Sequence, residues 1–497
     1  MQCYRVLWLC RRLTPKYRQL VGEEATSKRV QQLKAPAQIK VNSLLFLIAA
    51  VAALPAGFEV SFQPGSRDGA GQFMGGTEMR VLASHAGKLY AGNGYWEDRP
   101  GSEGRQGSKI LVLDAPDARW RVDHDFAERL PDGRHRDLAV SALEEARFAT
   151  DANGKALPAP VSLLIAANWD LGGTAQVFSR DDATGAWTAS TLAQDRPIPG
   201  FLPQVRSFGR HRDRATGVDL VFAGQDPRGV FSGAYDPAVS GRIRWRATPE
   251  LDLSTVSTAG ISGSNGYLRV SSFAECNGRL YVAVGQQIYE RIDGKEPHWR
   301  LLYTNRYPGR ISETGLRGLT ASPAPTGGSE VLLAAVEGTA PRIVRVDPRD
   351  GSEATDLDIA DFLRQHWGMP VSYVIAAYNA MAKVPDPAGG EALLIGIEAF
   401  IPAAAPVAAG HRAISVGYGR LEAGGWYLVR RVNGHYDLRQ VAAPPDSDLV
   451  SVRAILASPF AQQPGWVYFA GYDANKAAAH NTAWIIRGPE ASAISGP

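Results

Sequence analysis

Cysteine is scarce in this sequence, which has three in 497 residues: Cys3, Cys10 and Cys276. The first two precede a segment that we interpret below as a signal peptide, so a processed chain would keep one thiol and no internal disulfide. Cys276 follows a strand-like stretch and has no histidine close to it in sequence. That position favours a small residue packed in a turn over a catalytic nucleophile.

Several motifs that mark particular chemistries are also missing. The sequence has no Gly-x-Ser-x-Gly elbow, no phosphate-binding loop, no CxxC and no HExxH, which argues against nucleotide and thiol chemistry. Its nine histidines are scattered, which argues against a histidine-ligated iron or copper centre. The formal net charge is +3 and there is no Lys/Arg run, so we expect no nucleic-acid partner.

The longest apolar run, Leu44–Ala56, covers 13 residues and ends in small side chains. It is short for a membrane span and fits a signal-peptide core, with cleavage predicted after Ala53 or Ala56. We interpret residues 1–40 as a long leader or an over-called start, and residues 41–56 as the signal core and cleavage region. The mature chain is then secreted or periplasmic without a stable membrane span. A membrane anchor with a cytoplasmic tail is the alternative.

What the sequence does have is a strand–turn–strand unit that recurs seven times. Gln204–Asp236 is the clearest copy: an arginine-bearing strand, a charged turn, an apolar strand that ends in Gly-Gln-Asp, and a further strand. Each copy is followed by one or two more strand-like segments joined by turn residues. The copies begin near Glu78, Glu145, Gln204, Tyr267, Gly315, Tyr378 and Ser451.

Four strands per unit, repeated seven times, predict an all-β fold: a seven-bladed β-propeller that occupies residues 57–497 as one domain. The segment Asp356–His366 has helical character and reads as an insertion before the sixth unit. The last unit stops after its third strand, and Gly57–Phe62 is a short alternating strand without a repeat of its own. We therefore expect this mature N-terminal strand to close the last blade, which would remove exposed sheet edges.

The repeat pattern resembles the seven-bladed β-propellers of secreted bacterial proteins. Within it, SRDDATGAW (Ser179–Trp187) is similar to a degenerate Asp-box turn of sialidase-like propellers, although its spacing is longer than the motif requires. The WD, kelch and YWTD signatures are missing. The resemblance therefore implies a fold and no particular activity.

Aligning the units places arginine at the start of the inner strand in six of them, where a propeller lines its central channel. The seven positions are Arg80, Arg147, Arg206, Arg269, Arg317, Asn379 and Arg453. Guanidinium groups bind carboxylate, sulfate or phosphate in forked geometry. The arginines therefore predict either a site for a small anionic ligand or a fastener repeated between blades.

A second level of polar residues ends the second strand of each unit. It includes Asn93, Asn168, Gln225, Glu337, Glu398 and Tyr472. Glu337 and Glu398 would serve as acid and base, or acid and nucleophile, in glycoside hydrolysis, assisted by Tyr378 or Tyr472. The same carboxylates with the three amides would alternatively hold Ca²⁺, which prefers oxygen ligands. Salt bridges to the arginines are the third interpretation. No other cofactor is implied.

The sequence thus favours an exported monomeric propeller with a polar, arginine-ringed ligand site at the channel mouth. We expect a hydrolase or lyase that acts on an acidic sugar, lactone or ester, with a small anionic or carbohydrate-like ligand. The alternative is a non-catalytic propeller that binds a ligand or protein, or a scaffold. The second level varies from unit to unit, which favours a ligand site over a scaffold.

Overall fold

The structure, a computed structural model, describes residues 57–95, 105–194, 204–255, 269–305, 315–324, 327–416, 419–444, 447–475 and 480–496. The predicted leader and signal segment, residues 1–56, lie outside these ranges, as does Tyr267. The described part consists almost entirely of β-strands, which confirms the all-β class. In that part, no helix has the length and apolar character needed to cross a membrane.

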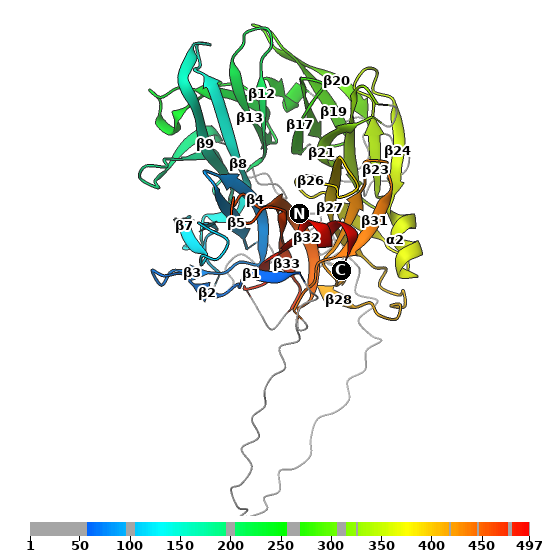
Figure 1. Cartoon of the computed structure of the whole chain (residues 1–497). Helices are drawn as coiled ribbons and strands as arrows, with labels where there is room; N and C mark the ends of the chain where they lie inside the picture. The colour runs from blue at the N-terminus through cyan, green and yellow to red at the C-terminus, as the bar shows by residue number, and fades with distance from the viewer. Residues whose placement is uncertain are drawn as a thin grey trace, which may run out of the picture. The chain divides into compact units, whose positions relative to one another are not determined.

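The strands of the first half form three successive antiparallel groups (Figure 1). The first contains β4 (Glu78–His85), β5 (Lys88–Gly94), β6 (Lys109–Leu113) and β7 (Arg121–Asp125). The second contains β8 (Asp137–Thr150), β9 (Ala156–Asp170), β10 (Thr174–Arg180) and β11 (Trp187–Gln194). The third contains β12 (Gln204–Arg212), β13 (Asp219–Asp226), β14 (Gly229–Tyr235) and β15 (Ile243–Trp245), and β16 (Leu251–Asp252) also pairs with β14. Each strand pairs with the next in its group.

The second half continues the pattern. One four-stranded sheet contains β17 (Val270–Cys276), β18 (Arg279–Val284), β19 (Gln287–Ile292) and β20 (His298–Thr304). Another contains β21 (Gly315–Pro323), β22 (Glu330–Glu337), β23 (Arg342–Val346) and β24 (Glu353–Asp358). A seven-stranded sheet follows, with β25 (Tyr373–Ala376), β26 (Ala382–Pro385), β27 (Glu391–Phe400), β28 (Ala413–Val416), β29 (Gly419–Glu422), β30 (Trp426–Arg430) and β31 (Tyr436–Gln440).

The last sheet joins the two ends of the described chain. It contains β32 (Leu449–Ala457), β33 (Trp466–Asp473) and β34 (Ala483–Pro489), and its fourth strand is β1 (Glu59–Phe62), antiparallel to β34. The helix α3 (Glu490–Ser495) follows β34, and a small ribbon of β2 (Ser66–Arg67) and β3 (Phe73–Met74) follows β1.

The predicted helical insertion is shorter than expected and begins later. Glu353–Asp358 is strand β24, and the helix α2 runs from Ile359 to Trp367. Asp358 caps it, since its side chain accepts a hydrogen bond from the backbone N–H of Asp361 at 2.9 Å. β24 pairs antiparallel with β23 along its whole length, with one register shift between Ile343 and Val344, so tertiary pairing overrides local helical character there.

Apolar side chains fill the spaces between consecutive groups. One cluster includes Leu164 of β9 and Val81 of β4, and another joins Val230 of β14 to Val282 of β18. A third contains Tyr468 of β33 and Leu111 of β6, so the last sheet packs against the first group. The apolar core therefore lies between neighbouring groups of strands, and it also connects the last sheet to the first group.

Small residues in the second strand of a group let the next group approach closely. A Cβ atom on Gly92 would lie 2.6 Å from the side chain of Val140, and one on Gly224 would lie 2.4 Å from Val270. Both neighbours belong to the first strand of the following group. The recurring Ala-Gly pair in the sequence thus marks the place where adjacent sheets meet.

Cys276 is buried at the end of β17. Burial raises the pKa of its thiol to about 12. A thiol of this kind stays protonated near neutral pH and is a poor nucleophile, which agrees with the packed role expected from the sequence.

Candidate functional site

Serine hydroxyls link the first strands of neighbouring groups. Ser141 of β8 donates a hydrogen bond to the carbonyl of Val205 at 2.5 Å. Ser207 of β12 donates to the carbonyl of Val270 at 2.9 Å, and Ser271 of β17 to that of Leu316 at 2.5 Å. All three serines lie where the register of the first strand shifts. The repeated fastener between inner strands is therefore built from serine along this part of the chain.

Three of the predicted arginines surround one aromatic ring. The guanidinium carbons of Arg453, Arg317 and Arg80 lie 4.1, 4.6 and 5.4 Å from the centre of the Tyr378 ring. These distances fall within the range of cation–π attraction. The three arginines come from β32, β21 and β4, which are distant in sequence. We call these four residues, with the glutamates described next, the central cluster.

Three glutamates supply the opposing charge. Glu398 of β27 forms an ion pair with Arg453 at 2.9 Å, and Glu337 of β22 is paired with Arg317. Glu78 lies between Arg80 and Arg453, at 3.7 and 3.6 Å. Each of these side chains is at most 5% exposed. Within the described residues, neither carboxylate oxygen of Glu78 has a hydrogen-bond donor, which leaves it able to accept from a ligand.

The buried charges shift the acidities of Tyr378 and Glu398 in opposite directions. Burial raises the pKa of the Glu398 carboxyl above its ordinary value, although Arg453 partly opposes this. Burial also acts to raise the pKa of Tyr378, but the charges of Arg80 and Arg453 outweigh it and lower that pKa. The cluster therefore combines a carboxyl that tends to keep its proton with a phenol that tends to lose one.

Arg206, Asn379 and Tyr472 lie at or beside the central cluster. Arg206 is held by Asp226 at 3.0 Å, and its charge acts on Tyr378. Asn379 donates from its side-chain amide to the carbonyl of Arg80 at 2.7 Å and contacts that of Arg453 at 3.5 Å. The ring of Tyr472 lies 5.3 Å from the guanidinium carbon of Arg453.

The structure does not bring Arg147 to this cluster. Its side chain is 67% exposed and pairs with Glu145 at 3.6 Å. The reason is the length of β8, which begins at Asp137 and spans 14 residues. Ser141 occupies the register position that Arg80 has in β4, because Asn168 pairs with Val140 as Asn93 pairs with Met79. Sequence alignment had placed Arg147 at the wrong end of its strand.

Arg269 is also displaced from the expected register. It precedes β17, and its backbone carbonyl accepts a hydrogen bond from the N–H of Gly285 at 2.8 Å. Ser271 stands at the register position that corresponds to Arg80. Of the six aligned arginines, three pack against the Tyr378 ring, and Arg206 acts on it through its charge.

Two of the three predicted amides form hydrogen bonds with backbone groups, and the third with a carboxylate. Asn93 donates to the carbonyl of Gly75 and accepts from the N–H of Lys109, both at 2.6 Å. Gln225 donates to the carbonyl of Asp226 at 2.7 Å, and Asn168 donates to the carboxylate of Asp137 at 3.1 Å.

The calcium alternative does not fit this donor set. Two of the amide oxygens already accept from the backbone, Asn93 from the N–H of Lys109 and Gln225 from that of Arg228. Both carboxylates already face arginines. In the part of the chain that the structure describes, no group of three or more His, Cys, Asp or Glu side chains is placed to hold a metal ion. Like charge from the arginines would further weaken cation binding.

Sequence reasoning assigned Tyr378 only an assisting role and gave Tyr373 none. The hydroxyl of Tyr373 donates to Glu337 at 2.6 Å. Tyr373 begins β25, and Tyr378 lies between β25 and β26, where the chain that pairs with β27 is interrupted. The replacement of arginine by asparagine at 379 was the signal that could have drawn attention to them.

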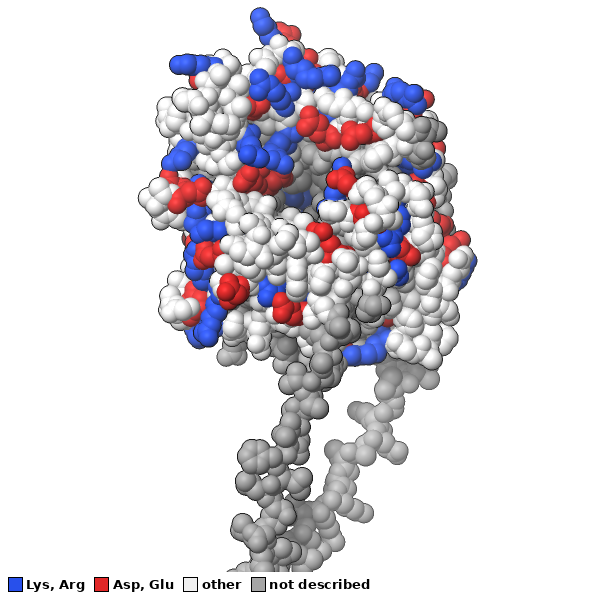
Figure 2. Space-filling view, in the orientation of Figure 1, with Lys and Arg blue, Asp and Glu red and all other residues white. Residues whose placement is uncertain are grey.

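Charged side chains of both signs are interspersed on the face shown in Figure 2, which also has a hollow near its middle. Such mixing produces no extended field of one sign. Recognition of a charged ligand at this face would therefore depend on local groups of side chains.

No protein-family model and no curated protein sequence matches this chain. Among solved structures, the α-L-arabinofuranosidase Arb93A from Fusarium graminearum, with an iminosugar inhibitor, is 11% identical and matches 87% of this chain and 97% of that one, at a TM-score of 0.39. An ancestral GH74 enzyme is 10% identical and matches 87% of this chain and 51% of that one, at 0.48. The Dos1 propeller is 11% identical and matches 83% and 92%, at 0.40. These likenesses are too distant to assign a site or an activity.

Proposed function

We propose that residues 57–497 form one seven-bladed β-propeller, exported as a monomer, whose central cluster is the active site of a hydrolase for acidic sugars. The pairing of strands in seven consecutive antiparallel groups, most of them of four strands, supports the blade count. The pairing of β1 with β34 supports closure of the last blade by the N-terminal strand. The observation that carries the function is the Tyr378 ring between three guanidinium groups and beside buried carboxylates.

If β1 closes the last blade, Phe62 should contribute strongly to the stability of the fold, although its strand has only four residues. Phe62 is 1% exposed and packs with residues of the last sheet and the first group. Phe62→Ala should lower the free energy of unfolding by about 3 kcal/mol, because it leaves a cavity at this junction. Val60→Ser, on the same strand but 43% exposed, is the matched control and should change little. Equal urea midpoints for the two variants would count against closure.

The charge balance of the central cluster favours an anionic substrate. Three arginines face three glutamates, and burial raises the pKa of the Glu398 carboxyl. In the state in which Glu398 carries a proton and Tyr378 is still a neutral phenol, the three guanidinium charges exceed the two remaining carboxylate charges. A substrate carboxylate would then neutralise the surplus through forked hydrogen bonds. This is the physical basis for choosing an acidic sugar.

The same groups can perform retaining glycoside hydrolysis. The Tyr378 hydroxyl, whose pKa is lowered, would release its proton to solvent. The phenolate oxygen would then attack the anomeric carbon, while Glu398 gives its proton to the departing glycosidic oxygen. The glycosidic bond breaks and a glycosyl–tyrosine forms. The Glu398 carboxylate would then take a proton from water, whose oxygen displaces the tyrosine. Glu337, held by Arg317 and Tyr373, would keep the guanidinium in place.

Glu398→Gln tests the role of the proton donor. We expect kcat/KM to fall by about 100-fold, since general acid catalysis contributes on that order. Activity of the unchanged protein should fall as pH rises through the pKa of Glu398, which lies above the ordinary carboxyl value; the variant should lack that descending limb. The assay uses methyl glycosides of acidic sugars, because an alkoxide leaving group needs the proton, with the methyl glycosides of neutral sugars as the control. Full activity in both Glu398→Gln and Glu337→Gln would remove the acid–base assignment.

A non-catalytic binding role is the second candidate, and one observation favours it. Arg317 and Arg453 each hold a carboxylate already, and the cluster is almost completely buried. A propeller of this kind would bind an acidic saccharide without turning it over. Binding measured by calorimetry together with no product from any glycoside would select this alternative.

A further inference from the structure

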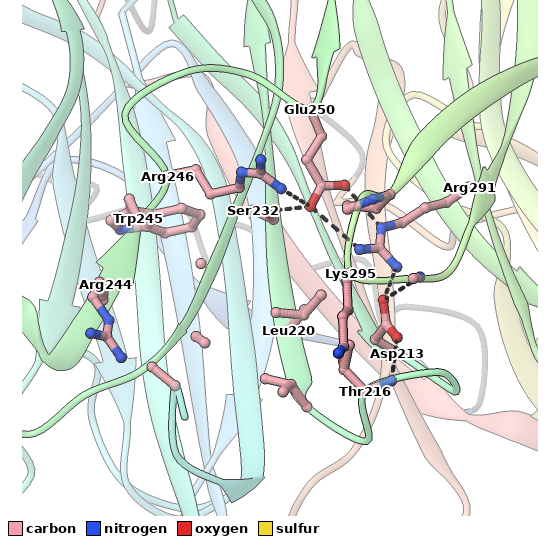
Figure 3. Close-up of a pocket in the computed structure, with 16 residues that line it drawn as sticks. Asp213, Thr216, Leu220, Ser232, Arg244, Trp245, Arg246, Glu250, Arg291 and Lys295 are labelled. Atoms are coloured by element: carbon pink, nitrogen blue, oxygen red, sulfur yellow. Dashed lines mark hydrogen bonds and ion pairs between the residues drawn. The ribbon is translucent and has the colours of Figure 1, made fainter. Parts of the chain in front are cut away.

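A pocket lies between the third and fourth groups of strands, apart from the central cluster. Its volume is about 390 Å³, which is within the range of small-molecule sites. Figure 3 shows side chains from both groups converging on it. Its lining comes from β13, β14, β15 and β19 with the turns beside them, and it shares no residue with the central cluster.

One wall of this pocket is a rigid charged network around Arg291. This arginine is 3% exposed and donates to Glu250 at 2.9 Å and to Asp213 at 2.8 Å. Ser232 donates its hydroxyl to Glu250 at 2.6 Å, and the backbone N–H of Thr216 donates to Asp213 at 2.9 Å. Asp213 already accepts two hydrogen bonds at each carboxylate oxygen, so it holds Arg291 in place and has no lone pair left for a ligand. Glu250 is fixed by Ser232 and Arg291 and keeps a lone pair that can accept from a ligand hydroxyl.

The opposite wall is apolar and carries an aromatic ring. Trp245 of β15 is half-buried and lies over Gly233, where an added Cβ would come within 2.8 Å of the indole. Leu220 and Ala234 continue this surface. A flat ring beside small aliphatic side chains suits the C–H face of a pyranose, which is apolar although its edges carry hydroxyls.

Basic side chains at the mouth exceed the acidic ones. Arg244 and Arg246 are 47% and 50% exposed, and Lys295 is exposed as well. Arg246 reaches Glu250 at 3.5 Å. Together with Arg291, four basic side chains line the pocket against two acidic ones, Asp213 and Glu250. Carboxylates just outside the lining balance two of the four, since Asp236 pairs with Arg244 at 3.4 Å and Asp293 with Arg291 at 2.6 Å. Arg246 and Lys295 are therefore the cations that can face an anionic substituent on the ligand.

We propose that this pocket binds an acidic saccharide, with Trp245 under the sugar ring, the carboxylate of Glu250 accepting from its hydroxyls, and Arg246 and Lys295 facing its acidic group. This inference stands whether or not the central cluster is catalytic. The carboxylate wall decides against a nucleotide, because phosphates and base-edge acceptors would face the negative charges of Glu250 and Asp213. A sugar offers hydroxyl donors there.

The test measures binding by isothermal titration calorimetry with the full chain. The probes are short oligomers of galacturonate, mannuronate and hyaluronan and a sulfated disaccharide, with maltotriose as the neutral comparison and AMP as the nucleotide comparison. We expect at least one acidic saccharide to bind with Kd of about 1 mM or tighter, and maltotriose and AMP to bind more weakly.

Two variants locate that binding. Trp245→Ala should weaken it at least about tenfold by removing the stacking surface. The double charge reversal Arg246→Glu and Lys295→Glu, at exposed positions that should leave the fold intact, should do the same through repulsion. Arg349→Ala, at an arginine that is 80% exposed and outside the pocket, is the control and should bind as the unchanged protein does.

Several results would overturn the proposal. They are no binding by any acidic saccharide, tighter binding of maltotriose or AMP, or full affinity in the charge-reversal variant. Affinity lost in Arg80→Ala but kept in both pocket variants would place the ligand at the central cluster instead. Loss of binding in the pocket variants with unchanged hydrolysis of a small glycoside would support the pocket and leave the proposed activity untouched.

Discussion

Tyr378→Phe should lower kcat/KM for the acidic glycoside by at least about 1,000-fold, the effect expected when a nucleophile is removed. Phenylalanine keeps the ring that Arg80, Arg317 and Arg453 surround, and with it most of the packing and cation–π attraction. Only the oxygen is lost. The unfolding midpoint should therefore stay close to that of the unchanged protein while turnover disappears.

The matched control is Tyr289→Phe. Tyr289 is also buried and its hydroxyl donates to Gln287 at 2.8 Å, but it lies on β19, outside the central cluster. It should keep full activity. If Tyr378→Phe keeps at least half of the activity as well, tyrosine is not the nucleophile. Mass spectrometry of protein quenched during turnover gives an independent reading, because the glycosyl–tyrosine adduct should appear on the peptide that contains residue 378.

The sequence predicted the class of fold because the information lies in short patterns. The recurring strand–turn–strand unit and its turn residues are local features, and the structure shows them as antiparallel strand pairs. It also singled out Arg80, Arg317, Arg453, Glu337 and Glu398, which the structure gathers. These residues sit next to strand ends that the pattern marks clearly.

The sequence misplaced Arg147 and Arg269 because strand length and register are set by pairing. β8 extends eight residues before Glu145, and nothing in its local composition shows where its partner begins. A shift in register moves a side chain to another depth or to the other face. The central position of Tyr378 depends on three strands meeting from distant parts of the chain, which no local pattern encodes. The serine links were not predicted either, because the carbonyl that each serine contacts lies in the next group of strands.

Arg453→Ala should be the most destabilising single change in the central cluster, lowering the free energy of unfolding by up to about 5 kcal/mol. Arg453 is the cation that Glu78 and Glu398 share, at 3.6 and 2.9 Å, and it also lies over the Tyr378 ring. Removing it leaves two almost completely buried carboxylates facing fewer cations. Urea unfolding measures the change, and Arg364→Ala, on an exposed ion pair of α2, should shift it by less than about 0.5 kcal/mol.

A double variant separates charge from packing in this prediction. In Arg453→Ala with Glu398→Gln, one buried negative charge is absent, so the double variant should be more stable than Arg453→Ala alone. The two changes should therefore be non-additive by about 1–3 kcal/mol. Additive changes would mean that water or another cation already screens Glu398, in which case the cluster is open to solvent. That result would favour ligand entry. It would also weaken the case for the raised pKa of Glu398, on which its role as the acid depends. The comparison of the single and double variants therefore tests both the fold and the proposed reaction.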